Sequence, residues 1–446
     1  MTGHWRARLQ RRIGEEVQYI VDAFSAKGIN VGVETEGTGV GYLYAEGEVL
    51  VLEQHVVQVR EILDRREPDQ QPAEGQARSE EPQRVLRGLV LQRFSGKSVP
   101  EVLEQIDREL GEGAATPNHI LTVSGEASPC AATDPIEVYE GTEPFPPVCR
   151  SNSGAGVRIF IADTGRLPDA DTHSWLAGVG GVDDPDSPEF HDGMLGPYSG
   201  HGTFVAGVLR CMAPAAEIYI GDVFATAGSA KESDFAITLQ AALSGGWDIF
   251  HLSIASPTRK NLPLLSFGEW LKLLEQRKGT ACVAPAGNSG TSRPHWPGAS
   301  QHIACVGALA ADGRSRASFS NYGGWVDAYA IGRDIVNAYA SGQFDVAMAP
   351  YDGQVRRFYG MAKWNGTSFS SPILTGLIAA RMWRSGENAS EAAAALLAEA
   401  RSRAIPGVGA IVVPCCDRRE AQCRCGGHCP PDRGSCLAPG GACTAR

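Results

Sequence analysis

In VRIFIADTG, residues 157–165, a nearly continuous apolar run ends at Asp163. A run of this length without polar alternation is typical of a strand that is covered on both faces, as in a parallel sheet. Because Thr164-Gly165 breaks the run, we expect Asp163 at the carboxyl end of the strand, where open α/β sheets bind their ligands. The alternative for this aspartate, taken alone, is that it caps the following turn.

Similar apolar runs recur downstream of this strand and alternate with helical patterns. The runs cover residues 218–223, 249–254, 282–286 and 303–309, and the helical stretches cover 233–243, 265–277 and 373–382. Strands that alternate with helices favour right-handed crossovers and a mostly parallel sheet. The sequence therefore predicts an α/β fold with a three-layer core over residues 157–413.

The first 124 residues predict a smaller α/β region made of two short units. Helices are expected at 8–27, 55–63 and 100–110, and strands at 48–52, 85–94 and 119–124, with a flexible polar linker at about 66–84. Residues 125–156 predict a Pro-rich linker to the main domain. Residues 414–446 carry seven of the 12 cysteines and no apolar periodicity, so a disordered tail is expected there, with zinc binding as the weaker alternative.

Composition narrows the class of protein and its location. The net charge of −11 argues against a nucleic-acid partner. No stretch approaches the roughly 18–20 consecutive apolar residues of a membrane span, which argues against a membrane protein. The N-terminal stretch has no apolar run of the kind that a secretory signal needs. We therefore expect a cytoplasmic protein.

Two further segments place chemically useful side chains at helix starts. His201 lies between glycines in GHGTFVAG, residues 200–207, and Ser368 lies in GTSFSSP, residues 366–372. The backbone dipoles of a helix N-terminus would stabilise an alkoxide or an oxyanion near Ser368. Singly, such a histidine is more often structural and such a serine more often an N-cap. Together with Asp163, they supply the base, nucleophile and orienting carboxylate that serine-catalysed peptide hydrolysis needs.

The segments IADTG, GHGTFVAG and GTSFSSP, in the order Asp, His, Ser, resemble the three signatures of the subtilisin family, the subtilases. The resemblance covers about residues 157–385. It implies a subtilisin-like fold and a serine endopeptidase that forms an acyl-enzyme on Ser368, with Asp163 and His201 completing the triad. It also implies Asn288 in the oxyanion hole, and substrate contacts from Ser253, Ala255, Ala286 and Gly287.

The resemblance has departures and limits. The family's usual Asn-x-Ser-x-Gly is here His251-x-Ser253-x-Ala255, so Ala255 adds a methyl group where substrate backbone passes. No cofactor is required. Many subtilases carry calcium, and the acidic residues at 183–189 offer oxygen ligands, but their spacing matches no calcium loop. The implied partner is a polypeptide substrate, and the oligomeric state is left open.

Three readings of the function stay open at this point. The first is an active endopeptidase, and the second is a subtilase fold that binds peptides without cleaving them. The third is a maturation protease with a narrow cleft that acts on one precursor. Residues 1–150 fit either a propeptide or a permanent accessory region.

Overall fold

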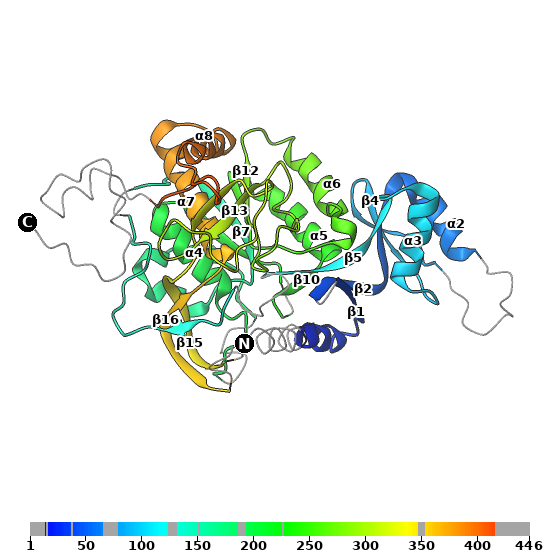
Figure 1. The fold of residues 1–446 in the computed structure, drawn as a ribbon, viewed down its shortest axis with the longest axis horizontal. Coiled ribbons are helices and arrows are strands. Elements are labelled where there is room, and N and C mark those ends of the chain that lie inside the picture. The colour runs from blue at the N-terminus through cyan, green and yellow to red at the C-terminus, as the bar shows by residue number, and fades with distance from the viewer. Residues whose placement is uncertain are drawn as a thin grey trace, which may run out of the picture.

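The computed structural model describes residues 14, 17–36, 39–65, 79–123, 132–149, 152–185, 193–224, 227–346 and 353–414. Its centre is a seven-stranded sheet (Figure 1). In spatial order the strands are β14 (Ala328–Ile331), β13 (Ala304–Leu309), β12 (Ala281–Pro285), β11 (Ile249–Leu252), β7 (Arg158–Asp163), β9 (Glu217–Asp222) and β8 (Gly180–Gly181). All neighbours in this sheet are parallel, which confirms the predicted sheet.

Helices cover both faces of the parallel sheet and make the three layers. Along β7, Ile159 and Ile161 join one apolar cluster, and Phe160 and Ala162 join another on the opposite face. The first cluster packs under α4 (His201–Met212), α7 (Thr367–Ser385) and α8 (Ala389–Ser402), and the second under α5 (Glu232–Ala242) and α6 (Leu265–Leu274). Since strand side chains alternate between faces, a strand buried on both must be apolar throughout, as β7 is.

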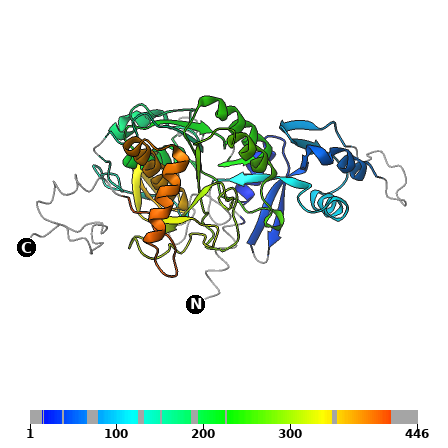
Figure 2. The same cartoon turned by 90° about the horizontal axis from the view of Figure 1, so that it is seen from above.

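Residues 1–124, here called the N-terminal segment, contribute to a second sheet beside α5 and α6 (Figure 2). Its strands are β1 (Val31–Glu36), β2 (Gly39–Leu52), β3 (Gln83–Leu86), β4 (Leu89–Arg93), β5 (Ala115–Thr122) and β10 (Ser229–Lys231). The last of these belongs to the region predicted as the peptidase domain, residues 157–413, so the two parts share one sheet.

Two expectations for the N-terminal segment need correction. The single strand predicted at 85–94 is a hairpin, because Gly88 adopts a positive φ of 89° between β3 and β4. The two predicted units form one sheet, since β2 pairs with both β4 and β5. Long-range pairing of this kind leaves no trace in local sequence patterns.

The helices of the N-terminal segment agree with the sequence pattern where the structure describes them. Residues 17–25 are helical, and α2 (Val56–Asp64) and α3 (Val99–Leu110) match the two later predictions. A capping box starts α3, in which Ser98 accepts a hydrogen bond from the Glu101 backbone and Glu101 accepts one from Ser98. Most of the linker predicted at 66–84 and the tail at 414–446 lies outside the described residues, although β3 begins at Gln83.

A third sheet lies at the other end of the molecule. It contains the long hairpin of β15 (Ile335–Asp345) and β16 (Val355–Trp364), and the short β6 (Ile136–Glu137) pairs with β16 (Figure 1). The predicted linker therefore contributes a strand to the main body. Among the described residues, short 3-10 helices connect elements of the main body at η2 (Pro168–Thr172), η3 (Ser174–Leu176), η5 (Leu243–Gly245) and η6 (Arg259–Asn261), and η1 (Glu53–His55) precedes α2.

None of the described helices is long and apolar enough to cross a membrane.

Candidate active site

Asp163 is the last residue of β7, which lies between β11 and β9 in the parallel sheet. Its carboxylate is fully buried, and Oδ1 accepts a hydrogen bond of 2.8 Å from the Thr164 backbone N–H. Because Oδ1 is held by the chain's own turn, the carboxylate has a fixed orientation at the carboxyl edge of the sheet.

His201 is the first residue of α4, and the glycines around it are required by space. Gly200 adopts a positive φ of 70°, and its backbone N–H donates to Asp184 Oδ2 at 2.8 Å. A Cβ atom at position 202 would lie 2.5 Å from the Gly165 carbonyl oxygen, so only glycine allows α4 to approach the turn after β7 this closely. The close approach brings the imidazole to the end of β7.

The His201 imidazole and the Asp163 carboxylate are joined directly. Nδ1 of His201 and Oδ1 of Asp163 are 2.8 Å apart, and both side chains are fully buried. Rings on two sides fix the imidazole plane, with the Trp364 centroid at 5.7 Å and the Phe369 centroid at 5.5 Å. The remaining nitrogen, Nε2, has no hydrogen-bond partner among the described residues.

Ser368 is the second residue of α7, directly before the phenylalanine that packs on His201. Its hydroxyl oxygen is buried and, like His201 Nε2, has no hydrogen-bond partner among the described residues. The structure thus brings Asp163, His201 and the start of α7 together, and it leaves a base nitrogen and a hydroxyl uncommitted in one buried place. Catalytic hydrogen bonds are often loose or unformed without substrate.

Asn288 lies after β12 and is tied to the start of α7 by its side-chain oxygen. Oδ1 accepts hydrogen bonds of 2.9 Å from both the backbone N–H and the hydroxyl of Thr367. The Thr367 hydroxyl in turn accepts one of 3.1 Å from the Gly287 backbone N–H. Since the oxygen branch of the amide is occupied by Thr367, the orientation of the Asn288 amide next to Ser368 is fixed.

The turn that carries Asn288 is held by a residue that sequence reasoning missed. Asn321 is fully buried, and its Nδ2 donates to the Ala286 carbonyl at 2.9 Å. Its Oδ1 accepts from the backbone N–H groups of Ser289 and Thr291, each at 3.1 Å. Asparagine is common in loops, so no local signal separates this one from a surface residue.

The four predicted substrate-contact residues lie on two segments beside this site. Ser253 donates its backbone N–H to the Ala162 carbonyl at 3.1 Å, which places it next to the end of β7. Ala286 and Gly287 follow β12, and Gly287 has a φ of 97° that favours glycine. A Cβ on Gly287 would lie 3.3 Å from the Ala255 methyl group, so the two segments face each other here.

His251, the departure noted in the sequence, lies in β11 on the face that holds α4 and α7. The Thr375 hydroxyl donates to the Ser371 carbonyl at 3.2 Å, so in the 2.9 Å contact with His251 the imidazole Nδ1–H is the donor. Nε2 is then an acceptor, and it has no partner among the described residues. Burial lowers the pKa of His251 to about 4, with Asp163 opposing the shift.

A second buried histidine supports the loop after Asn288. His295 Nδ1 donates to the Arg293 carbonyl at 3.2 Å, and Nε2 faces the Ser289 hydroxyl at 3.4 Å. Burial lowers the pKa of His295 to about 4. Neither histidine was singled out as a site residue from the sequence, because an isolated histidine carries no distinguishing pattern.

The N-terminal segment lies along one side of the site. β5 pairs antiparallel with β10, matching Thr122 to Ser229 and Leu121 to Ala230. Thr122 N–H also donates to Ser256 Oγ at 2.9 Å, and Val123 N–H donates to the Gly228 carbonyl at 3.0 Å. The end of β5 therefore lies between β10 and residues 253–256, where Ser253 and Ala255 were expected to contact substrate. The position between β10 and residues 253–256 is here called the groove.

The chain reappears on the other side of the site at residues 132–133. Ala132 N–H donates to the Asn365 carbonyl at 2.9 Å, and Asn365 Nδ2 donates to Thr133 Oγ1 at 2.9 Å. Trp364 Nε1 donates to the Thr133 carbonyl at 2.5 Å. Contacts on both sides are consistent with the complete burial of Asp163, His201 and Ser368.

The acidic stretch considered for calcium serves a structural purpose where it is described. Asp184 is fully buried, and its Oδ2 accepts from Gly200 N–H at 2.8 Å and from Thr164 Oγ1 at 3.3 Å. Residues 186–192 lie outside the described part of the chain. Within the described part, no three His, Cys, Asp or Glu side chains are grouped as a metal site would need.

Two known proteases are similar to this chain in sequence. M-protease of Shouchella clausii (strain KSM-K16) is 30% identical over 240 residues, covering 52% of this chain and 55% of that protein. Subtilisin Savinase of Lederbergia lenta is also 30% identical over 240 residues, covering 77% of its length. The chain therefore spans little more than half the length of the first of these relatives.

Among solved structures, fervidolysin from Fervidobacterium pennivorans, a keratinolytic enzyme related to subtilisin, is similar in fold. It is 16% identical with a TM-score of 0.54, covering 85% of this chain and 61% of that one. A sequence model of the subtilase family matches residues 154–408, more than half of the chain, and this range holds Asp163, His201, Asn288 and Ser368. The chain belongs to the subtilase family of serine peptidases.

Proposed function

We propose that the chain is a serine endopeptidase that cleaves polypeptides through Asp163, His201 and Ser368. The observation that carries the proposal is the buried, 2.8 Å Asp163–His201 pair beside the start of α7, where Ser368 Oγ and His201 Nε2 are both uncommitted. A general base needs one nitrogen in reserve for the reacting proton. His251 Nε2 also lacks a partner among the described residues, but its Nδ1 pairs with a hydroxyl and not with a carboxylate. His201 combines the spare nitrogen with a buried carboxylate partner.

The roles follow from the hydrogen bonds. Asp163 Oδ1 holds the proton of His201 on Nδ1, so Nε2 is the basic nitrogen. Nε2 takes the proton of the Ser368 hydroxyl as Oγ attacks the substrate carbonyl, and then gives it to the leaving amine. Water hydrolyses the resulting acyl-enzyme. Side chains and water supply every step, so we propose that no cofactor is required.

The oxyanion of the tetrahedral intermediate needs donors that are oriented in advance. Thr367 holds the oxygen of the Asn288 amide, and this fixes the amide group beside Ser368. We propose the amide nitrogen as one oxyanion donor. The Ser368 backbone N–H, at the start of a 19-residue helix, is the other candidate, and the helix dipole adds to it. Removing one such donor typically costs about 3–4 kcal/mol of transition-state stabilisation.

We also propose that the N-terminal segment is an inhibitory propeptide and not a permanent accessory region. The pairing of β5 with β10 puts its end in the groove, and residues 132–133 are bound on the other side of Ser368. A segment with a separate function would have no need to occupy the groove.

The rival function is a peptide-binding subtilase without catalysis. Incubating the purified chain with a peptide library, with mass spectrometry of the products and of the chain itself, separates the two. We expect new peptide termini with the wild type and none with Ser368→Ala, which loses on the order of a million-fold in turnover. Equal cleavage by this variant would contradict the proposal, and bound but uncut peptides with the wild type would favour the rival.

A further inference from the structure

The described ion pairs of Lys and Arg between the N-terminal segment and the peptidase domain all have the same polarity. Five ion pairs of Lys or Arg with Asp or Glu join these two parts among the described residues, and in each the cation belongs to the peptidase domain. The cations are Lys231, Arg259, Lys260 and Arg293, here called the cation surface. Their carboxylate partners are Glu36, Glu48, Asp107 and Glu112.

One of these contacts, Arg259–Asp107, is well shielded from water, whereas Lys260 and Glu112 are 41% and 56% exposed. Arg259 Nη1 and Lys260 Nζ both lie 2.8 Å from Asp107 Oδ2, and the Arg259 and Asp107 side chains are each 7% exposed. Lys260 also reaches Glu112 at 2.7 Å. An exposed ion pair contributes little. Removing one partner of a shielded pair such as Arg259–Asp107 costs more, because it leaves the other charge shielded from water and uncompensated.

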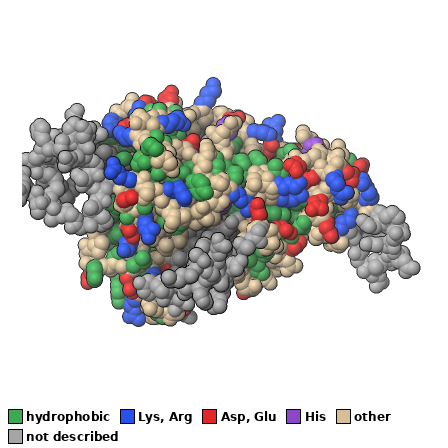
Figure 3. Space-filling model, in the orientation of Figure 1, with side chains coloured by type: hydrophobic (Ala, Val, Ile, Leu, Met, Phe, Trp, Pro, Cys, Tyr) green, Lys and Arg blue, Asp and Glu red, His purple; other side chains and the backbone are tan. Residues whose placement is uncertain are grey.

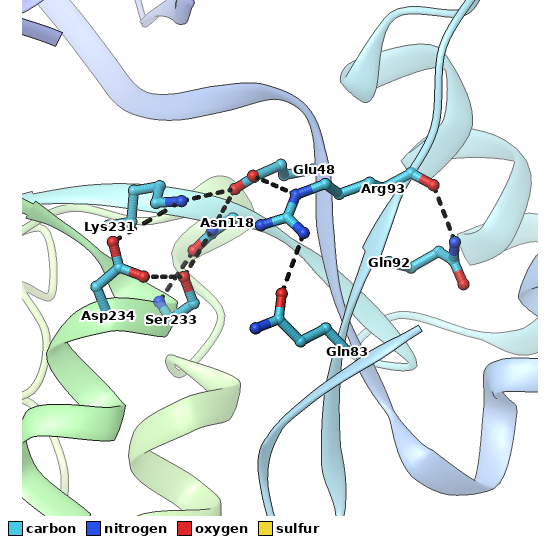
Figure 4. A network of polar contacts seen from close by, with 8 residues as sticks. All are labelled: Glu48, Gln83, Gln92, Arg93, Asn118, Lys231, Ser233 and Asp234. Atoms are coloured by element: carbon cyan, nitrogen blue, oxygen red, sulfur yellow. Dashed lines mark hydrogen bonds and ion pairs between the residues drawn. The ribbon is translucent and has the colours of Figure 1, made fainter. Parts of the chain in front are cut away.

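A second contact point joins β10 to β2 across β5, which lies between these two strands in the sheet. Figure 4 shows Glu48 between Lys231 of the peptidase domain and Arg93 of its own sheet. Lys231 Nζ is 3.5 Å from Glu48 Oε2, and both side chains are about 11–12% exposed. Asn118 of β5 joins this network, because its Nδ2 donates to Glu48 Oε2 at 2.7 Å and to Ser233 Oγ at 3.0 Å.

The loop that carries two of the cations is fixed by the peptidase domain itself. Lys260 and Asn261 both adopt positive φ angles, of 54° and 58°, which non-glycine residues rarely do. Arg293 holds this loop, because its Nε donates to Asn261 Oδ1 at 2.6 Å and its Nη2 donates to the Thr258 carbonyl at 2.8 Å. A strained, braced loop presents Arg259 and Lys260 in place, and strain of this kind concentrates at functional sites.

Two acidic groups of the peptidase domain lie near this surface: Asp234 is paired within the domain, and Glu232 is held partly by the domain and partly by His119 of the N-terminal segment. Glu232 Oε1 accepts from Ser266 N–H at 3.1 Å, and its Oε2 lies 2.7 Å from His119 Nδ1. Asp234 accepts from Ser233 Oγ at 3.2 Å and lies 3.8 Å from Lys231. On the face drawn in Figure 3, acidic and basic side chains are close together over the N-terminal segment, as such pairing requires.

We infer that the cation surface is a docking surface for acidic residues of a polypeptide substrate, upstream of the residues that pair with β10. The inference rests on the proposed peptidase function and names the substrate class of that site. A substrate that replaces β5 in the groove leaves the four cations without Glu36, Glu48, Asp107 and Glu112. Carboxylates upstream in the substrate then restore the same contacts.

The test uses two peptides that differ only in upstream charge. One has the sequence of residues 106–128, and the other carries Asn and Gln in place of Asp107 and Glu112. Both compete for the full-length chain in one tube, and mass spectrometry follows their loss. The ratio of the two kcat/KM values does not depend on how much of the chain has a free groove, so release of the N-terminal segment cancels.

We expect the acidic peptide to be preferred by about fivefold or more at low salt. The preference should fall when Arg259→Gln or Lys260→Gln is introduced, and it should fall in high salt through screening. Lys272→Gln is the matched control, because Lys272 pairs with Glu269 within α6 and should leave the ratio unchanged. A ratio of one with the wild type, or a ratio that both variants keep, overturns the inference.

A binding measurement keeps this result separate from the catalytic proposal. Fluorescence anisotropy gives the Kd of each labelled peptide for the full-length Ser368→Ala chain, where no turnover is needed. Tighter binding of the acidic peptide supports the docking surface even if the wild type cleaves neither peptide, and that failure would count against the peptidase function alone. Equal Kd values, or no binding of either peptide, overturn the docking surface.

Discussion

Asn288 illustrates how one residue can be placed for one step of a reaction. Its amide oxygen is held by two hydrogen bonds from Thr367, the residue that precedes Ser368. Because Thr367 precedes Ser368 at the start of α7, these hydrogen bonds hold the Asn288 amide next to the nucleophile. A preorganised donor of this kind acts on the charge of the transition state and contributes little to the ground state.

We therefore predict that Asn288→Ala lowers kcat by about 100- to 1000-fold and leaves KM nearly unchanged. Steady-state kinetics on a single peptide substrate measure both constants. A variant that raises KM at constant kcat would show that Asn288 binds substrate only. Circular dichroism of the variant controls for loss of the Thr367 contacts.

The buried histidines make the stability of the fold depend on pH. The pKa values of His251 and His295 are lowered to about 4 by burial, whereas an unfolded histidine titrates at about 6.5. Between these values the unfolded chain holds protons that the folded chain lacks. The free energy of unfolding is therefore complete above about pH 6.5 and falls as the pH drops towards 4.

The expected loss is on the order of 3 kcal/mol for each of these two histidines between pH 6.5 and pH 4. Urea unfolding at a series of pH values measures it. His251→Asn should flatten the slope over this range, and His302→Gln, at an exposed position, is the matched control. An unchanged slope in His251→Asn would contradict the burial argument.

At the scale of elements, three starts and ends meet at the site: the end of β7, the start of α4 and the start of α7. The carboxyl ends of parallel strands lie at one edge of the sheet, so residues that follow different strands are brought close together by the sheet itself. β5 is the element that competes for this edge, because its last residues bond to Ser256 and Gly228.

Val123→Pro tests the competition directly. Proline has no N–H, so the variant loses the bond from position 123 to the Gly228 carbonyl. We expect the N-terminal segment to bind the groove less tightly, and a fluorophosphonate probe to label the full-length chain about fivefold faster. Val123→Ala keeps the N–H but loses the packing of the buried Val123 side chain, so it is the control for that loss, and Val123→Pro should label faster than Val123→Ala. Equal rates for Val123→Pro and the wild type would show that β5 does not limit access.

The sequence predicted five of the seven strands of the parallel sheet but not β8 and β14, and it was insufficient for the other two sheets. Runs such as 157–162 are apolar because both faces are buried, so local composition reveals the strand. The pairing of β5 with β10 joins residues more than 100 positions apart, and it depends on register that no local pattern records. The hairpin of β15 and β16 was missed because polar residues such as Asn337 and Ser341 interrupt its apolar pattern.

The residues of the candidate site also fall into those that the sequence could predict and those that it could not. Asp163, His201 and Ser368 could be proposed because they occur in recognisable segments, and the structure brings these segments together. Asn321 could not, since its importance comes from three backbone groups that reach it only in the fold. The roles of the site residues, the domain boundaries and a cytoplasmic location stay predictions.

In the whole molecule, the N-terminal segment shares a sheet with the peptidase domain, lies beside its candidate active site and forms ion pairs with its cation surface. Each of these contacts has an effect on activity only if Ser368 is an activated nucleophile. That activation depends on His201 and Asp163, whose buried pair is the centre of the proposal.

The most direct measurement is fluorophosphonate labelling of the full-length chain, with the modified residue located by mass spectrometry. An unactivated serine does not react with this probe, so labelling reports the nucleophile and not the fold. We predict one adduct on Ser368 in the wild type, and none on the same residue in His201→Ala. No adduct on Ser368 with the wild type and with Val123→Pro, or equal labelling of His201→Ala, would contradict the account.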